Sequence, residues 1–250
     1  MIDEAFQDQA IVLKQAGFNT SVIGGGHIRP VPELDTICVY RGWMLTPEEY
    51  HEQFAATVVD HGALPLTSAE EYAATHHLPN WYPLLEKWTM DSVSFGNSPD
   101  TAERVYHFAS GAFGAKEGLK LQVKDYVKSL KTDGGSVATS ADEVKEILAK
   151  MEKYRGVIEG GIVLRKYEDF FSNSETRYFM LNGRYFGMEH GFDLRHMSIL
   201  DQVKDLIPSP FWSIDIAMRV DGQARIVEIG DGQVSDIVGW TPERFAEIWK

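Results

Sequence analysis

Asp215 and Glu228 are spaced along the chain so that their two carboxylates could bind one cation. Asp221-Gly222 lies between them and is typical of a two-residue hairpin turn. Counting outward from this turn places Asp215 opposite Glu228, and the Cβ atoms of such partners lie roughly 4.5–5.5 Å apart. Two carboxylates this close repel each other unless a cation neutralises them, and carboxylate oxygens are ligands that Mg²⁺ prefers. The spacing therefore predicts a metal site on an antiparallel hairpin.

The same spacing has a second explanation, in which side chains or water neutralise the two carboxylates. Glu228 would then pair with Arg219 or Arg225, and Asp215 would be hydrated. The spacing alone leaves both explanations open. The other face of the hairpin is apolar and is expected to face the core; it carries Ile214, Ile216, Met218, Val220, Val227 and Ile229.

Two further groups of basic residues could hold phosphate. Asn182-Gly183 predicts a second hairpin, and Arg177 on its first strand could clamp a phosphate or a carboxylate with two hydrogen bonds. A simple surface ion pair would explain Arg177 equally well. Three lysines, at 124, 128 and 131, precede a glycine-containing loop at 132–136, which suits a polyphosphate or a solvated charged loop.

Composition excludes several classes of function. The 250-residue chain has a net charge of −13, which argues against general binding to nucleic acid or to anionic membranes. The single cysteine, Cys38, excludes an internal disulfide framework. The sequence shows neither an apolar run long enough to span a membrane nor a basic leader followed by an apolar stretch. These features favour a cytoplasmic protein.

The order of predicted elements changes along the chain. A helix at 3–16, strands at 19–23 and 36–40, and capping boxes at Thr46 and Ser68 predict a small parallel α/β region. Residues 24–26, all glycine, are expected to form a flexible connection, and residues 76–83 a linker. The middle region predicts a strand at 121–124, a helix after Ser140 and a strand at 157–167. The last third predicts antiparallel strands followed by a helix after Thr241.

Taken together, these segments resemble the ATP-grasp superfamily, and in particular small ATP-grasp proteins of bacteria and phages. The likeness rests on Tyr40-Arg-Gly-Trp-Met-Leu45, His77-Leu-Pro-Asn-Trp-Tyr82, Val123-Lys-Asp-Tyr-Val-Lys-Ser129, and Ser213-Ile-Asp215 with Val227-Glu-Ile-Gly-Asp-Gly232. It implies a mixed α+β and α/β fold, in which an N-terminal α/β domain at 1–88 precedes an ATP-grasp domain at 89–250. That second domain would comprise a glycine-loop part at about 105–165 and a metal-binding antiparallel part at about 166–250, which together clasp ATP.

The resemblance also implies a role for individual residues. Lys124, assisted by Lys128, would contact the ATP phosphates, and backbone groups of Leu164, Arg165, Lys166 and Tyr167 would hold adenine. Glu175 would contact the ribose, and Arg177 would face the γ-phosphate or an acyl-phosphate. Asp215 and Glu228 would bind Mg²⁺. Asp231 would be a third ligand, because Gly230 stands where most of these enzymes have asparagine. Arg41 would hold an acceptor.

The implied activity is an ATP- and Mg²⁺-dependent ligase that joins a carboxylate to an amine through an acyl-phosphate. The acceptor would be a small molecule, a peptide or a protein terminus, and the sequence does not define the oligomeric state. A regulatory or interaction module that binds ATP without turnover is the alternative. A covalent nucleotidyl ligase, suggested by Lys124-Asp125, lacks the glycine expected after the aspartate.

Overall fold

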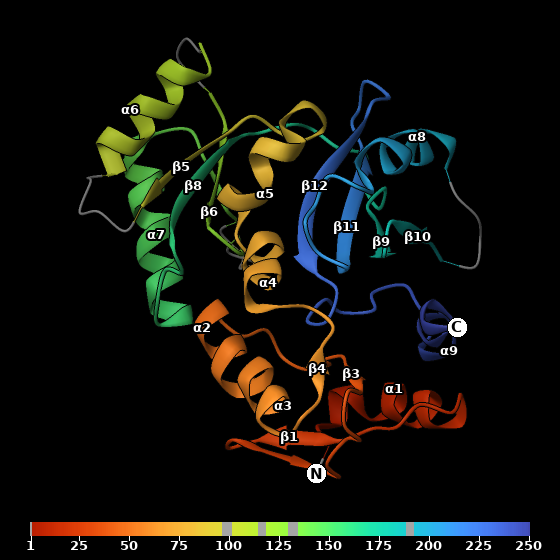
Figure 1. Ribbon diagram of the computed structural model, residues 1–250. Helices are drawn as coiled ribbons and strands as arrows, with labels where there is room; N and C mark the ends of the chain where they lie inside the picture. The colour runs from red at the N-terminus through yellow and green to blue at the C-terminus, as the bar shows by residue number, and fades with distance from the viewer. Residues whose placement is uncertain (1, 97–101, 115–118, 130–134, 189–192) are drawn as a thin grey trace. The chain divides into compact units, whose positions relative to one another are not determined.

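The computed structural model describes residues 2–96, 102–114, 119–129, 135–188 and 193–250. The chain forms two compact units, and their residues are coloured along the chain in Figure 1. Unit 1 comprises Met1–Thr75, Glu175–Ile216 and Glu228–Lys250, and unit 2 comprises His76–Ser174 and Ala217–Val227. These bodies do not follow the boundary expected at residue 88, because unit 1 combines the N-terminal segment with most of the C-terminal strands. In the described part of the chain, no helix has both the length and the apolarity needed to cross a membrane.

The N-terminal segment of unit 1 mixes parallel and antiparallel pairs. Helix α1 (Glu4–Gln15) is followed by strands β1 (Val22–Gly24) and β2 (His27–Arg29), which pair antiparallel. The predicted flexible glycine connection is wrong, because Gly25 and Gly26 form the tight turn between these strands, with φ of 59° and 73°. Strands β3 (Ile37–Cys38) and β4 (Leu64–Pro65) pair parallel, as the alternation of strand and helix predicts.

The helices between and after these strands begin where the capping boxes predict. Thr46 caps a continuous helical segment made of α2 (Pro47–Tyr50), a π-helical turn (His51–Ala55) and α3 (Ala56–Asp60). Ser68 and Glu71 form the second capping box, before α4 (Ala69–His76). The predicted linker at 76–83 is wrong, because Leu78–Leu85 is a helix, α5, which buries Leu78, Trp81 and Leu85. Pro79 is tolerated there because it lies in the first turn. A 3-10 turn, Glu86–Trp88, follows.

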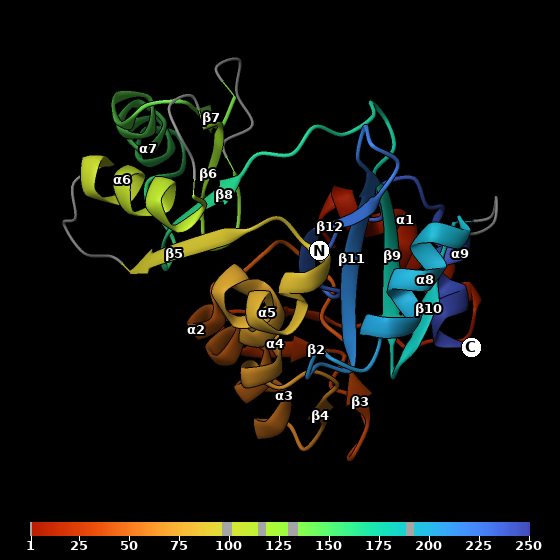
Figure 2. The same ribbon diagram turned by 90° about the horizontal axis from the view of Figure 1, so that it is seen from above.

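The sheet of unit 2 has four antiparallel strands in the order β5-β8-β6-β7. Their bounds are β5 Ser92–Gly96, β6 Leu121–Asp125, β7 Val137–Ala138 and β8 Gly161–Lys166. Helices α6 (Ala102–Ala112) and α7 (Ala141–Arg155) pack together on one face of this sheet (Figure 2). Ser140 caps α7 as predicted. The buried core comprises Val105, Ala109, Leu121, Val123, Ala138, Val144, Ile147, Met151 and Leu164.

The second four-stranded sheet has the order β10-β9-β11-β12. Its strands are β9 Thr176–Leu181, β10 Arg184–Phe186, β11 Phe211–Met218 and β12 Ala224–Asp231. The Asn182-Gly183 hairpin is confirmed, because both residues have positive φ and Arg184 pairs with Leu181. Helices α8 (Leu194–Val203) and α9 (Pro242–Ala246), with a 3-10 turn at Glu247–Trp249, complete the C-terminal part.

The turn between β11 and β12 differs from the two-residue turn that Asp221-Gly222 predicts. Arg219 N–H donates to the Gln223 carbonyl at 2.8 Å, and Gly222 N–H donates to the Arg219 carbonyl at 2.9 Å, which defines a three-residue loop. At the far end, Gly232 N–H donates to the Phe211 carbonyl at 3.2 Å. The two ends differ in register by one residue, so β12 contains one extra residue between them.

Burial places this extra residue between Ile226 and Ile229. Both isoleucines are buried, whereas strict alternation would bury only one of them. Val227 and Val220, expected on the core face, are half-buried and exposed. The extra residue restores the register that the two-residue turn would have produced, because Ser213 again lies beside Gly230.

Candidate functional site

Arg177 and Asp215 form a buried ion pair in unit 1. They are direct partners on β9 and β11, since Asp215 pairs with Arg177 in the strand register. Arg177 donates from Nε to Asp215 Oδ1 at 2.8 Å and from Nη2 to Oδ2 at 2.6 Å. The Asp215 side chain is only 4% exposed, because β11 lies between two other strands. Two parallel hydrogen bonds hold both side chains in one geometry.

Two further carboxylates, those of Glu228 and Glu175, surround the same guanidinium. Burial lowers the pKa of Arg177, but the hydrogen bonds and charge of Asp215, followed by the charges of Glu228 and Glu175, raise the pKa above its ordinary value. One arginine therefore faces three acidic groups. These groups supply only oxygen ligands and leave excess negative charge, which fits a divalent cation such as Mg²⁺.

The arginines expected to neutralise the hairpin are engaged elsewhere. Arg225 donates to Glu168 and Arg219 forms an ion pair with Glu168. The expectation that Asp215 is merely hydrated is also wrong, because Arg177 contacts both of its oxygens. Sequence reasoning placed Arg177 and Asp215 in one site but did not predict their direct contact, since the pairing of β9 with β11 joins distant segments.

Asp231 lies apart from Asp215 and Glu228. It is fully buried, and its Oδ1 accepts hydrogen bonds from the backbone N–H and the side-chain amide of Gln233. Burial raises the pKa of Asp231 to about 7, although the bonds from Gln233 and the charge of Arg41 oppose this shift. Strand alternation directs residues 228 and 231 to opposite faces of β12. The structure therefore does not bring Asp231 together with the other two expected metal ligands.

Arg41 ties the loop after β12 to two helices. Its Nη1 donates to the carbonyls of Gly232, Gln233 and Ser235 at 2.8, 2.8 and 3.1 Å. Nε and Nη2 donate to the side chain of Gln9 in α1. The guanidinium also lies 4.6 Å from the ring centre of Phe245 in α9. These contacts occupy most of its donors, so the geometry favours a structural role over the expected contact with an acceptor.

Lys124 and Lys128 lie at one end of β6 in unit 2. Lys124 is 4% exposed, while Lys128 is exposed on the turn that follows the strand. Asp125 Oδ1 fixes this turn by accepting from the backbone N–H groups of Val127 and Lys128 at 2.8 and 2.6 Å. The turn holds the backbone from which both lysines project. Lys131 and most of the predicted glycine loop lie outside the described residues.

The expected hinge, residues 164–167, divides into a buried half and an accessible half. Leu164 and Arg165 pair with both neighbouring strands, which occupies their backbone groups, so the expected backbone contact with adenine is wrong for these two residues. The Arg165 side chain is buried and donates to Ser92, Thr89 and the Val227 carbonyl. The N–H groups of Lys166 and Tyr167 are also engaged, by Asp91 and Lys120.

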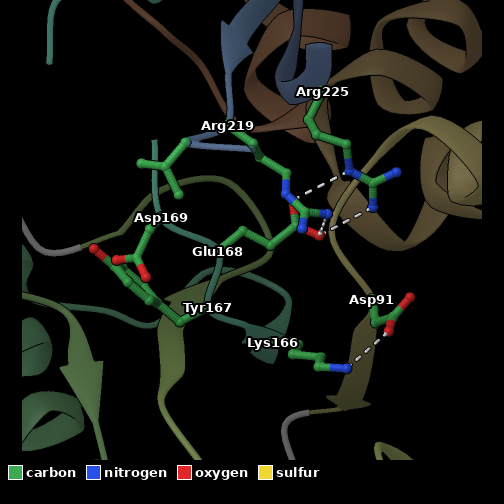
Figure 3. Close-up of a pocket in the computed structure, with 8 residues that line it drawn as sticks. Asp91, Lys166, Tyr167, Glu168, Asp169, Arg219 and Arg225 are labelled. Atoms are coloured by element: carbon green, nitrogen blue, oxygen red, sulfur yellow. Dashed lines mark hydrogen bonds and ion pairs between the residues drawn. The ribbon is translucent and has the colours of Figure 1, made fainter. Parts of the chain in front are cut away.

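Lys166 and Tyr167 line a pocket of about 420 Å³ in unit 2 (Figure 3). Its other lining residues are Asp91, Glu168, Asp169, Arg219, Val220 and Arg225. Glu168 holds two arginines at the rim, with Arg225 Nε at 3.1 Å and Arg219 Nη1 at 3.6 Å. Tyr167 keeps an exposed ring, and Lys166 forms a loose ion pair with Asp91 at 3.9 Å. An exposed ring beside cationic groups can hold a base and phosphate-bearing groups.

Sequence reasoning missed most of this pocket. The charged run Lys166-Tyr-Glu-Asp169 after an apolar strand was a usable local signal for its floor. Arg219 and Arg225 gave no such signal, because they come from the turn region of the β11–β12 hairpin, about fifty residues further along the chain.

Solved ATP-grasp enzymes have a similar fold. D-cycloserine synthetase DcsG matches with a TM-score of 0.66 and 14% identity over 97% of this chain and 92% of that protein. The ATP-grasp ligase PsnB, solved with a phosphomimetic variant of its minimal precursor, Mg and ADP, matches with a TM-score of 0.56 and 12% identity over 98% and 92%. The D-alanine-D-alanine ligase of Coxiella burnetii matches with a TM-score of 0.58 and 11% identity over 95% and 72%.

These likenesses show the fold, an ATP-grasp fold of mixed α and β content, as the sequence predicts. A comparison with curated proteins finds no significant match. Residues 48–248 match the family model for an ATP-grasp domain, the third family of its clade. The match covers most of the chain, and the chain therefore belongs to this ATP-grasp family.

Proposed function

We propose that the protein is an ATP- and Mg²⁺-dependent ligase that joins a carboxylate to an amine through an acyl-phosphate. The observation that carries this proposal is the cluster of Asp215 and Glu228 around Arg177, in a chain that belongs to an ATP-grasp family. The similar folds of a D-cycloserine synthetase, the ATP-grasp ligase PsnB and a D-alanine-D-alanine ligase support a ligase activity.

In this proposal Asp215 and Glu228 hold Mg²⁺. Each oxygen of Asp215 accepts one hydrogen bond from Arg177, which leaves a lone pair on each oxygen for a cation. Bound Mg²⁺ would supply charge neutralisation for the phosphates, which is the main task of a protein in phosphoryl transfer. PsnB, a protein of similar fold, has been solved with Mg and ADP.

Unit 2 would contribute the nucleotide contacts. Lys124 and Lys128 supply positive charge on a turn fixed by Asp125. The exposed Tyr167 ring and Lys166 offer a stacking surface and a cation in one pocket. Arg177 balances negative charge in unit 1 and would stabilise the charge that develops on a transferred phosphoryl group. The acceptor would be a small molecule, a peptide or a protein terminus.

The first experiment measures Mg²⁺-dependent binding of ADP by calorimetry, because this readout does not need the acceptor. We expect Asp215→Asn and Glu228→Gln to abolish the Mg²⁺-dependent part of the affinity. Lys124→Met should weaken binding by about tenfold or more, since a hydrogen bond to a charged group contributes about 1.5–3 kcal/mol. Asp142→Asn and Glu146→Gln, which replace exposed carboxylates on α7, are the matched controls.

The second experiment measures ADP release from ATP with a panel of carboxylates and with hydroxylamine as the amine, which traps an acyl-phosphate as a hydroxamate. Full Mg²⁺-dependent turnover in either carboxylate variant would overturn the metal assignment. Tight nucleotide binding without ADP release across a broad panel would instead identify a binding module.

A further inference from the structure

His76, His77 and Glu159 form a cluster of metal-ligating groups in unit 2. His76 Nε2 lies 2.8 Å from Glu159 Oε1, and His77 Nε2 lies 3.2 Å from the same oxygen. One ligand atom from each residue lies within 4.8 Å of the other two. Within the described residues, this is the one group of three or more such side chains that converges in this way. None of the three is assigned to nucleotide or Mg²⁺ binding above.

A break between two helices makes the two consecutive histidines converge. Consecutive side chains diverge in a continuous helix or strand, by about 100° or 180°. His76 is the last residue of α4, whereas His77 has extended φ and ψ of −98° and 123° before α5 begins. The change in backbone conformation turns both imidazoles toward Glu159, and their ring centres lie 5.1 Å apart.

Backbone contacts also fix Glu159. Its N–H donates to Asp125 Oδ2 at 3.4 Å, and its carbonyl accepts from Tyr126 and Gly161 at 3.2 and 2.9 Å. Gly160 and Gly161 follow with φ of 73° and 148°, and a Cβ on either would collide with the Tyr126 ring. The Tyr126 ring also packs edge-on against His77. The loop that carries Glu159 is therefore held close to the histidines before any ion binds.

The distances suit a small divalent ion that accepts nitrogen ligands. Zinc–nitrogen and zinc–oxygen bonds of about 2.0–2.2 Å place neighbouring ligand atoms about 3 Å apart. The separations of 2.8 and 3.2 Å are close to that value, so an ion could bind with little rearrangement. Imidazole nitrogens favour Zn²⁺ and similar transition metals over Mg²⁺, which prefers an all-oxygen set.

The surroundings leave room for a fourth ligand. The His76 side chain is 1% exposed, whereas those of His77 and Glu159 are 20% and 18% exposed. The site is thus closed on one side and reaches solvent on the other, where water could complete a tetrahedral set. The Glu159 carboxylate supplies one negative charge, and the nearby Asp125 carboxylate lowers the electrostatic cost of a cation.

We propose that His76, His77 and Glu159 bind one Zn²⁺ ion per chain. The ion would join the junction of α4 and α5 to the loop before β8, two segments more than eighty residues apart in the sequence. Its role would be to stabilise unit 2, because it cross-links the helices to the strand that leads into the Lys166 pocket. The inference does not depend on the proposed ligase activity.

The test measures Zn²⁺ binding to untagged, chelator-treated full-length protein by calorimetry, with visible absorption of bound Co²⁺ as a second readout. We expect one ion per chain and a rise in melting temperature on adding Zn²⁺. His77→Ala and Glu159→Gln should each weaken the affinity at least about tenfold, more than the loss caused by altering an outer-shell partner. His77 makes no side-chain cap bond to α5, so its replacement spares that helix.

His107→Ala is the matched control, because His107 is an exposed histidine 4.0 Å from Glu103 on α6. Its affinity for Zn²⁺ should equal that of the unmodified protein. Unchanged affinity in folded His77→Ala or Glu159→Gln protein would overturn the proposal. So would the absence of binding to the unmodified protein, or a loss of binding in the His107 variant. Each result is independent of the nucleotide experiments, since those use Mg²⁺ and ADP.

Discussion

The Arg177 guanidinium contacts both oxygens of Asp215 across neighbouring strands, at 2.8 and 2.6 Å. The strand register makes them direct partners, and burial keeps water from competing for either group. The same arginine feels the charges of Glu228 and Glu175. A cation in this cluster is therefore part of the fold, and the proposed metal would join it rather than replace it.

Arg177→Ala should destabilise the protein by about 3–5 kcal/mol, because it leaves a buried carboxylate without its cation. Mg²⁺ should restore part of this loss if Asp215 and Glu228 bind it, and the restoration should vanish in the Arg177→Ala, Asp215→Asn double variant. Urea unfolding with and without Mg²⁺ measures both effects. Arg195→Ala, which removes an exposed partner of Asp193, should change stability little. Equal Mg²⁺ rescue in the double variant would contradict the prediction.

Lys166 and Arg225 line the same pocket but should behave differently when replaced. Lys166→Ala removes a half-exposed pair with Asp91, worth at most about 1 kcal/mol, so it should weaken ADP binding more than stability. Arg225 donates to Glu168 and to the carbonyls of Lys87 and Thr89, so Arg225→Ala should mainly destabilise unit 2. Paired measurements of ADP affinity and urea midpoint distinguish these outcomes. A stability loss in Lys166→Ala as large as that in Arg225→Ala would refute this distinction.

Arg41→Lys should lower the free energy of unfolding by about 2 kcal/mol or more. Lysine keeps the charge but cannot reproduce the hydrogen bonds to three carbonyls and to Gln9. Denaturant unfolding checks the loss, and steady-state kinetics check whether the KM for an acceptor changes once one is known. A large rise in that KM without destabilisation would support the acceptor contact expected from the sequence.

Asp231→Asn should remove a pH dependence of stability. Burial raises the pKa of Asp231 to about 7, so the native state binds a proton that the unfolded chain releases above about 4. This contribution to stability is fully present below the unfolded pKa and is lost as the pH rises to about 7. Asparagine keeps an acceptor for Gln233 and does not titrate. The difference in urea midpoint between the variant and the unmodified protein should therefore grow in favour of the variant from pH 5 to pH 8.

Local sequence signals predicted the elements well where the signal was itself local. Thr46, Ser68 and Ser140 cap helices as expected, because a capping bond joins residues only three positions apart. Asn182-Gly183 set its hairpin because both residues readily adopt positive φ. The linker predicted at 76–83 was wrong, because its buried residues gain helical structure from packing, which composition does not reveal.

The sequence by itself determined the family, the ATP-grasp fold, and the segments that carry Lys124, Arg177, Asp215 and Glu228. Only the tertiary structure decided which side chains meet. It paired Arg177 with Asp215, separated Asp231 from them, and gave Arg41 to three backbone carbonyls. It also added one residue to β12, which corrected the register that a three-residue loop would otherwise have shifted. The reason is physical: helix caps and turns depend on neighbouring residues, whereas ion pairs and strand register depend on which distant segments fold against each other.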